Sequence, residues 1–290
     1  MCATQVVNGF LEYLKKQGKS QYTIISYSGD LSQFEKFLHN KGKNIVNATE
    51  SDIELFSKVL NKGEFSQSTK ARKIHAIKSL YKYLLQKGLV KVNPARNINA
   101  PKVELGAPRI LKKIEYMALR EASRKDVKLH AIVEVLLQTG IRVGELVRLK
   151  LKDLQFTKNK IPYLYIEQFG SQDSRTVPLP KAAYEALKKY IDTERLKIKP
   201  NDENSPLFVS KTGKPLQIRN VRERVKKLYK EVGIEDATVN DLRNTFIMHH
   251  LKRGVSPIII ARMVGHKRMT TIERMLKYVK ELEVKALRSL

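Results

Sequence analysis

Apolar residues in the first hundred positions recur every three to four residues, which is the spacing that places them on one face of a helix. Clear runs cover Val6 to Leu14, Tyr27 to Leu38 and Ile74 to Leu85. The last run stops shortly before Gly88, a residue type that is favoured just past a helix end. This part of the chain shows helical spacing only, so we expect a bundle of four or five helices.

A linker is predicted between positions 93 and 108. The apolar periodicity fades there, and three prolines and a glycine interrupt the chain. We therefore expect a helical domain at 1–97, a linker at 98–108 and a second domain at 109–290.

The second domain begins with helices and then changes its pattern. After the apolar run at 132–137 and Gly140, the segments Tyr163–Ile166 and Thr176–Leu179 flank a polar stretch, which is typical of a β-hairpin. Pro178 cannot donate a ladder hydrogen bond, so the second strand should lie at the edge of its sheet.

Helical spacing dominates the rest of this domain. One helix is expected to end at Met263, with Ser256 as its N-cap and Pro257 in its first turn. The other helices are expected at Ile114–Ser123, Val143–Leu149, Lys181–Arg195, Gln217–Val232, Asp241–Lys252 and Met269 to the end. The predicted fold class is mostly α with a small antiparallel sheet: a helical bundle followed by an α+β domain.

Basic residues outnumber acidic residues almost two to one, 56 against 29, which gives a formal net charge of +27. Residues 1–100 hold 16 basic and 7 acidic residues and the remainder holds 40 and 22, so both domains carry the excess. A merely lysine-rich surface usually brings matching glutamates. A long polyanion is the natural partner, because each phosphate that is neutralised releases counterions. We predict that the chain binds duplex DNA.

Cys2 is the only cysteine, which argues against an internal disulfide framework and a cysteine-based zinc site. The N-terminus lacks the basic and apolar segments of a signal peptide, and no apolar stretch reaches membrane-spanning length. We expect a cytoplasmic protein associated with the nucleoid and without a bound metal.

Three short motifs carry candidate chemistry. In Thr139-Gly-Ile-Arg-Val-Gly-Glu145, Arg142 follows an apolar helix and a glycine turn, so its guanidinium starts from a fixed base. The second motif, Asn240-Asp-Leu-Arg-Asn-Thr-Phe246, contributes Arg243. The third is Met263-Val-Gly-His266, which is followed by two threonines at 270 and 271.

The order and spacing of these motifs, with the hairpin between the first two, resemble the tyrosine recombinase (phage integrase) family of Xer type. The N-terminal part is similar to the core-binding domain of that family in Lys19-Ser-Gln-Tyr-Thr23 and in Ser68-Thr-Lys-Ala-Arg-Lys73. The resemblance therefore implies DNA contacts at Lys19, Ser20, Thr23, Ser68, Thr69, Arg72 and Lys73.

The same resemblance implies a C-shaped clamp around duplex DNA and a homotetramer on paired sites. It also implies strand exchange through a 3′-phosphotyrosyl intermediate, without cofactor or metal. Arg142 and Arg243 would grip the nonbridging phosphate oxygens bidentately and remain charged. His266 would donate a further hydrogen bond to the phosphate, so the three side chains should converge on one pocket, with Asn240 beside them.

Three positions depart from the pattern of the family. The segment Gln168–Arg175 lacks the hairpin lysine that protonates the leaving 5′-oxygen, and a guanidinium is a poor proton donor. Asn240 replaces a histidine and cannot transfer a proton. Met275 occupies the position of the attacking tyrosine, and Tyr278 lies three residues further on, about one helical turn away.

Three interpretations follow. The chain is an active recombinase that uses Tyr278, or a catalytically impaired relative that binds DNA or regulates an active partner, in which case Tyr278 is a packing or surface residue. The third is an unrelated helical transcription regulator, because Asp241–Lys252 and Ser256–Met263 have the lengths of a helix-turn-helix. This last interpretation gives no reason for the Arg142 motif or for the hairpin.

Overall fold

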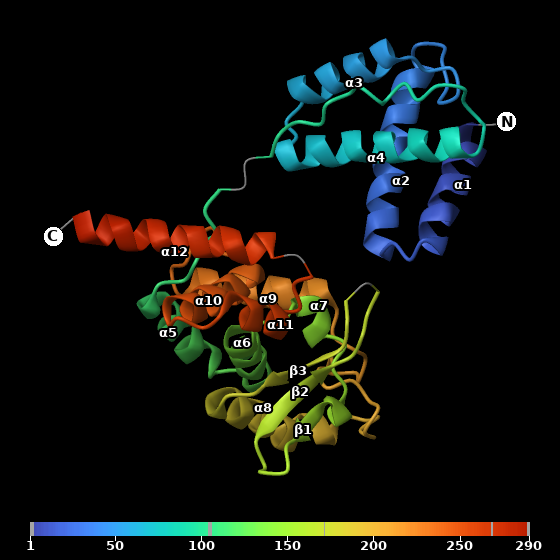
Figure 1. The fold of residues 1–290 in the computed structure, drawn as a ribbon. Coiled ribbons are helices and arrows are strands. Elements are labelled where there is room, and N and C mark those ends of the chain that lie inside the picture. Colours follow the sequence, from blue (N-terminus) through green and yellow to red (C-terminus); the bar gives the residue numbers. More distant parts are fainter. Residues whose placement is uncertain (1–2, 104–105, 171, 268, 289–290) are drawn as a thin grey trace. The chain divides into compact units, whose positions relative to one another are not determined.

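The computed structural model describes the backbone of residues 3–103, 106–170, 172–267 and 269–288. Within those ranges it describes the side chains of residues 5–279. The chain divides into two compact units, Met1–Gly106 and Ala107–Leu290. Each unit has its own apolar core. The predicted class, mostly α with one small antiparallel sheet, is confirmed (Figure 1).

The first unit contains four helices in its described part: α1 (Ala3–Lys16), α2 (Gln21–His39), α3 (Glu50–Lys62) and α4 (Gln67–Gln86). Serine hydroxyls begin two of them. Ser20 accepts a hydrogen bond from the Thr23 backbone N–H (3.1 Å) and Ser66 accepts one from Thr69 (3.3 Å), so each satisfies an otherwise unpaired donor of a first turn. Aromatic rings fill the core between the helices, among them Phe10, Phe34, Phe56 and Tyr81.

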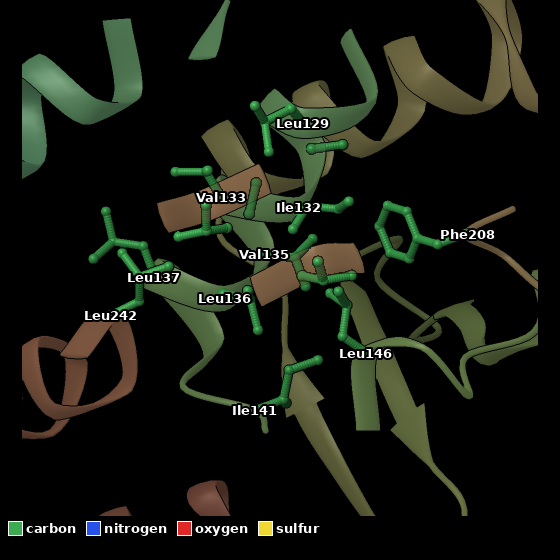
Figure 2. Packing of buried hydrophobic residues seen from close by; sticks show 14 of the residues in the cluster. Leu129, Ile132, Val133, Val135, Leu136, Leu137, Ile141, Leu146, Phe208 and Leu242 are labelled. Atoms are coloured by element: carbon green, nitrogen blue, oxygen red, sulfur yellow. The ribbon is translucent and has the colours of Figure 1, made fainter. Parts of the chain in front are cut away.

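The second unit is built around α6 (Val127–Thr139), which is apolar on nearly every side and therefore buried. Figure 2 shows its side chains, from Leu129 to Leu137, within the apolar cluster that also contains Phe208 and Leu242. Helices α5 (Lys113–Ser123), α8 (Lys181–Thr193), α9 (Ile218–Glu231) and α10 (Val239–Lys252) pack against α6.

Three antiparallel strands form the sheet in the order β1 (Leu154–Phe156), β2 (Pro162–Ile166) and β3 (Arg175–Pro178). The predicted hairpin is confirmed, and β3, with Pro178, lies at an edge as expected. Strand β1 was not predicted, because three residues are too short for alternation to be visible.

Two expected helices are shorter than their patterns indicate. Helix α7 covers only Val143–Leu146, because the backbone that follows pairs with the segment 205–207 and enters a 3-10 turn at Leu151–Asp153. Helix α8 ends at Thr193, and Arg195 begins a 3-10 turn, Arg195–Lys197, with its guanidinium buried against three backbone carbonyls. At the C-terminal ends of α7 and α8, hydrogen bonds to other segments thus stop the helix before the apolar spacing does.

The chain closes with α11 (Pro257–Val264) and α12 (Thr270–Arg288) packed on α10. Pro257 stands in the first turn of α11 as predicted, but the Ser256 side chain makes no capping bond. An apolar cluster holds the three helices together; it includes Phe246, Ile260, Val264, Ile272, Met275 and Val279. Within the described ranges, no helix has both the length and the apolar character that crossing a membrane requires.

Candidate functional site

Three guanidiniums converge on the C-terminal end of α11. The last carbonyls of a helix lack intrahelical partners and form the negative end of its dipole. Arg175 donates to the Met263 carbonyl (2.8 Å) and Arg243 to the Val264 carbonyl (2.7 Å). Residues from the first motif, the hairpin and the second motif therefore meet at the third motif.

Arg142 completes this arrangement from the start of α7. It donates to the carbonyls of Val264 (3.3 Å) and Gly265 (2.9 Å), and its side chain remains 33% exposed. Glu145, one turn later, accepts from the Arg142 backbone N–H and guanidinium (2.7 and 3.1 Å) and from Arg175 (2.8 and 3.0 Å). These four hydrogen bonds outweigh burial and lower the pKa of the Glu145 carboxyl. Glu145 thus fixes the orientation of two cations.

Arg243 is buried more deeply than the sequence suggested. Only 5% of the residue is exposed, and its guanidinium also donates to the Gly140 carbonyl (2.5 Å). Burial, followed by the charge of Arg142, lowers its pKa to about 9. Its hydrogen bonds join the end of α6 to the end of α11, so Arg243 has a structural role beside the phosphate contact that its motif predicts.

We call Arg142, Arg175 and Arg243 the arginine cluster. His266 follows directly after Gly265, whose carbonyl contacts that cluster. Burial, followed by the charges of Arg243, Arg142 and Arg175, lowers its pKa to about 4, so the imidazole is neutral near pH 7. Its Nδ1 atom is buried without a hydrogen-bond partner among the described residues. The cluster therefore sets three positive charges against the single carboxylate of Glu145 beside an unsatisfied imidazole, an arrangement that favours an anion.

Gly265 makes this close approach possible. Its backbone is left-handed (φ +67°), and an added Cβ would lie 2.7 Å from the Arg175 guanidinium. Glycine is required here both for the conformation and for the space.

The tip of the hairpin contributes two further contacts that the sequence analysis did not include. Gln172 accepts a hydrogen bond from Arg142 (3.0 Å). Its neighbour Asp173 accepts one from Lys267 (3.1 Å), the residue after His266. Charged residues at 173 and 267 are the only sequence signal for the second contact, and they lie 94 positions apart.

Asn240 lies one turn before Arg243 on α10, with an exposed side chain that lines a groove of about 1200 Å³. Basic side chains Arg222, Lys226 and Lys230 line the same groove and follow one face of α9. Val143, next to Arg142, also lines the groove. Glu235 and Asp236, between α9 and α10, line the groove as well.

Met275 and Tyr278 occupy different surroundings on α12. Met275 is 1% exposed and packs inside the apolar cluster of α10, α11 and α12. Tyr278 is half-buried and packs against the margin of that cluster.

The residues expected to touch DNA in the first unit fall into two groups. Five lie at or next to the starts of α2 and α4, where Ser20 caps α2: Lys19, Ser20 and Ser68 are exposed, and Thr23 and Thr69 are half-buried. The remaining two residues, Arg72 and Lys73, contact Asp30 of α2.

Lys73 is buried, and its ammonium donates to Asp30 (2.9 Å) and to Gln33 (2.7 Å). A DNA contact from Lys73 is therefore wrong for this structure, because its charge is neutralised inside the bundle and joins α4 to α2. Arg72 remains 40% exposed at the side chain and can still face a ligand.

Two family models of known proteins match this chain. The Phage integrase family matches residues 107–281, and the "Phage integrase, N-terminal SAM-like domain" matches residues 7–88. The chain belongs to the phage integrase family. This membership excludes the third interpretation, an unrelated transcription regulator.

Relatives of this integrase-family chain match over nearly their whole length. It is similar to the tyrosine recombinase XerC of Thermodesulfovibrio yellowstonii, with 32% identity over 276 residues (92% of this chain, 89% of the relative). The crystal structure of XerA recombinase is 28% identical and covers 98% of this chain and 99% of that one, with a TM-score of 0.55. A lambda integrase tetramer bound to a Holliday junction, 20% identical, shares the fold over 94% of this chain and 76% of that one (TM-score 0.75).

Proposed function

We propose that this protein is a site-specific DNA recombinase that holds a backbone phosphate at the arginine cluster and exchanges strands through a tyrosyl–phosphate bond. The observation that carries the proposal is the meeting of Arg142, Arg175, Arg243 and His266 around one helix end with a single opposing carboxylate. A phosphodiester under attack gains negative charge on its nonbridging oxygens, and pre-positioned cations stabilise that charge.

We assign different roles to the side chains that meet at this helix end. Arg142 is the exposed member and would bind the phosphate oxygens directly. Arg175, whose guanidinium is occupied by Glu145 and the Met263 carbonyl, would act by holding Arg142 and the turn before α12. His266 offers a neutral imidazole that can donate one hydrogen bond without proton transfer.

The groove beside Asn240 supports duplex binding next to this phosphate site. Arg222, Lys226 and Lys230 are exposed on one face of α9. Such a row can follow a phosphate backbone. Asn240 stands between that row and Arg243 and would hydrogen-bond an adjacent phosphate oxygen.

Tyr278 is our candidate nucleophile. It lies on the same helix as Met275 and its ring is only half-buried, whereas Met275 is enclosed and its thioether cannot form the ester. Tyr278 lies about one helical turn after the family position of the nucleophile, so we expect it to cleave DNA more slowly than a tyrosine at that position would.

The strand-exchange proposal includes assembly on DNA. The lambda integrase that shares this fold forms a tetramer on a Holliday junction. We propose the same number of subunits here, and the measurement is the mass of the complex with a synthetic four-way junction.

A second candidate function is DNA binding without cleavage, in which the chain regulates an active partner. It is favoured by Met275 at the position of the attacking tyrosine and by Asn240 in place of a histidine.

One experiment separates the two. Random-sequence duplexes are enriched for binding, and the selected sequence is then nicked next to each phosphate in turn, so that a cleaved strand end diffuses away and traps any covalent intermediate. A denaturation-resistant protein–DNA adduct establishes strand transfer. Tight, sequence-selective binding without an adduct at any phosphate establishes the second function, and the absence of selective binding overturns both.

A further inference from the structure

We propose that Lys267 protonates the leaving 5′-oxygen during strand cleavage, delivered from the turn between α11 and α12 and held in place by Asp173 of the hairpin. The inference rests on the proposed strand-transfer function. An alkoxide is a poor leaving group and departs readily only when it gains a proton as its bond to phosphorus breaks.

The arginine cluster itself cannot supply that proton. Arg142 and Arg175 carry guanidiniums, which hold their protons too firmly to act as acids. Arg243 is buried, and its guanidinium already donates to the carbonyls of Gly140 and Val264. His266 is neutral near pH 7, because burial and the neighbouring arginines lower its pKa to about 4. Asn240 has no ionisable proton.

Lys267 is adjacent to this cluster from two directions. Along the chain it follows His266 directly. Through space its Nζ lies 3.1 Å from Asp173 Oδ1, and Asp173 follows Gln172, whose side chain accepts a hydrogen bond from Arg142 (3.0 Å). Lys267 therefore adjoins His266 along the chain, and its partner Asp173 adjoins the residue that Arg142 contacts.

The ion pair is suited to a transient role. The Lys267 side chain is 49% exposed and that of Asp173 is 76% exposed, so water screens their attraction. Exposed pairs of this kind contribute little to stability. An arriving phosphate can therefore draw the ammonium away from Asp173 at little cost, while Asp173 keeps it close to the site before DNA binds.

The step balances without a co-reactant. The tyrosyl oxygen forms a bond to phosphorus and gives its own proton to water. The bond from phosphorus to the 5′-oxygen breaks, and that oxygen takes a proton from the Lys267 ammonium. The neutral amine that remains regains a proton from water, or from the attacking 5′-hydroxyl when the strand is rejoined.

The test compares two nicked duplexes of the selected sequence, one with the natural 5′-oxygen and one with a bridging 5′-sulfur, which leaves without a proton. Single-turnover adduct formation is measured for the full chain, for Lys267→Ala and for Lys267→Arg, which keeps the charge but not the usable proton. Lys188→Arg is the matched control, because Lys188 is also an exposed lysine paired with a carboxylate (Asp192, 2.5 Å) but lies on α8.

Both Lys267 variants should lose about 10²- to 10⁴-fold in rate on the oxygen substrate. On the sulfur substrate they should stay within about tenfold of the unaltered chain, which is a rescue that a merely structural or charge role would not give. Lys188→Arg should change neither rate.

Two outcomes overturn the inference for different reasons. If the unaltered chain cleaves both substrates and the Lys267 variants slow both equally, or slow neither, Lys267 is not the proton donor although strand transfer stands. If the unaltered chain forms no adduct even with the sulfur substrate, the proposed function itself fails, and the role of Lys267 fails with it.

Discussion

Arg142 and Gly265 lie 123 positions apart in the chain, yet the Nη2 atom of Arg142 donates a 2.9 Å hydrogen bond to the Gly265 carbonyl. The same guanidinium contacts Val264 and Glu145, so the turn that presents His266 is fixed by a residue from the first motif. Phosphate binding and the position of α12 are therefore coupled: whatever loosens this turn should disturb both.

Gly265→Ala should destabilise the second unit. A left-handed backbone costs a non-glycine residue about 1–2 kcal/mol, and the new Cβ would also press on the Arg175 guanidinium at 2.7 Å. Gly233→Ala is the control, because Gly233 has φ +69° and open space around its Cβ position. Urea unfolding should show a larger loss for Gly265→Ala than for Gly233→Ala. Equal losses would mean that the contact with Arg175 does not constrain the turn.

Glu145→Gln should lower stability by about 3–5 kcal/mol, because it leaves Arg175 without its charged partner in a buried setting. The pKa of Glu145 is lowered in the folded state, so the carboxylate stabilises the fold above the unfolded pKa and this contribution is lost as pH falls through the folded value. Unfolding measured from pH 7 downwards should therefore show a weaker acid dependence in Glu145→Gln.

Glu121→Gln supplies the comparison for that experiment. Glu121 also pairs with an arginine, Arg124 (2.8 Å), but its side chain is exposed. Its replacement should change stability by less than about 1 kcal/mol. A similar small change in both variants would show that the Arg142–Glu145–Arg175 group is not a buried unit.

Much of this fold could be predicted from local patterns. Period-three-to-four apolar spacing located the long helices, and the break at Gly140 is visible in the structure as a left-handed residue that ends α6. The ends of α7 and α8 could not be predicted, because they depend on bonds to the segment 205–207 and on the burial of Arg195.

Three members of the candidate site could be predicted from the motifs, but its hairpin contacts and its energetics could not. Motif spacing identified Arg142, Arg243 and His266. Nothing in one sequence indicates that Arg243 would be buried with its hydrogen bonds directed at carbonyls, or that Lys73 would be neutralised by Asp30. Burial depends on the assembled fold, so a basic residue expected on the surface can instead be buried and join two helices through its hydrogen bonds.

DNA binding should weaken steeply with salt, since both units carry excess positive charge. The slope of log K against log salt should fall by about 0.9 for each phosphate contact that is removed. The double variant Arg222→Ala with Lys226→Ala should therefore flatten the slope by up to about 2. Lys188→Ala with Lys189→Ala removes the same charge from α8 and should leave the slope nearly unchanged. Equal slopes in both double variants would exclude the groove beside Asn240 as the DNA surface.

The last prediction concerns the nucleophile. Tyr278→Phe should abolish the covalent adduct while leaving stability and DNA affinity nearly unchanged, because the ring that packs on the apolar cluster is retained and only the hydroxyl is lost. Tyr184→Phe is the matched control: Tyr184 is also half-buried in the second unit but stacks edge-on against Phe156, and its change should leave adduct formation intact.

Met275→Tyr tests the same question from the opposite side. A tyrosine at this enclosed position must either bury its hydroxyl without a partner or displace the surrounding side chains, so we expect a loss of about 1–3 kcal/mol in unfolding free energy. If Tyr278 is the nucleophile, the adduct of this variant should still disappear when Tyr278→Phe is added. Suppose instead that the unaltered chain forms no adduct and Met275→Tyr gains one that survives Tyr278→Phe. Tyr278 would then be a packing residue, and the chain with Met275 would bind and hold DNA without cutting it.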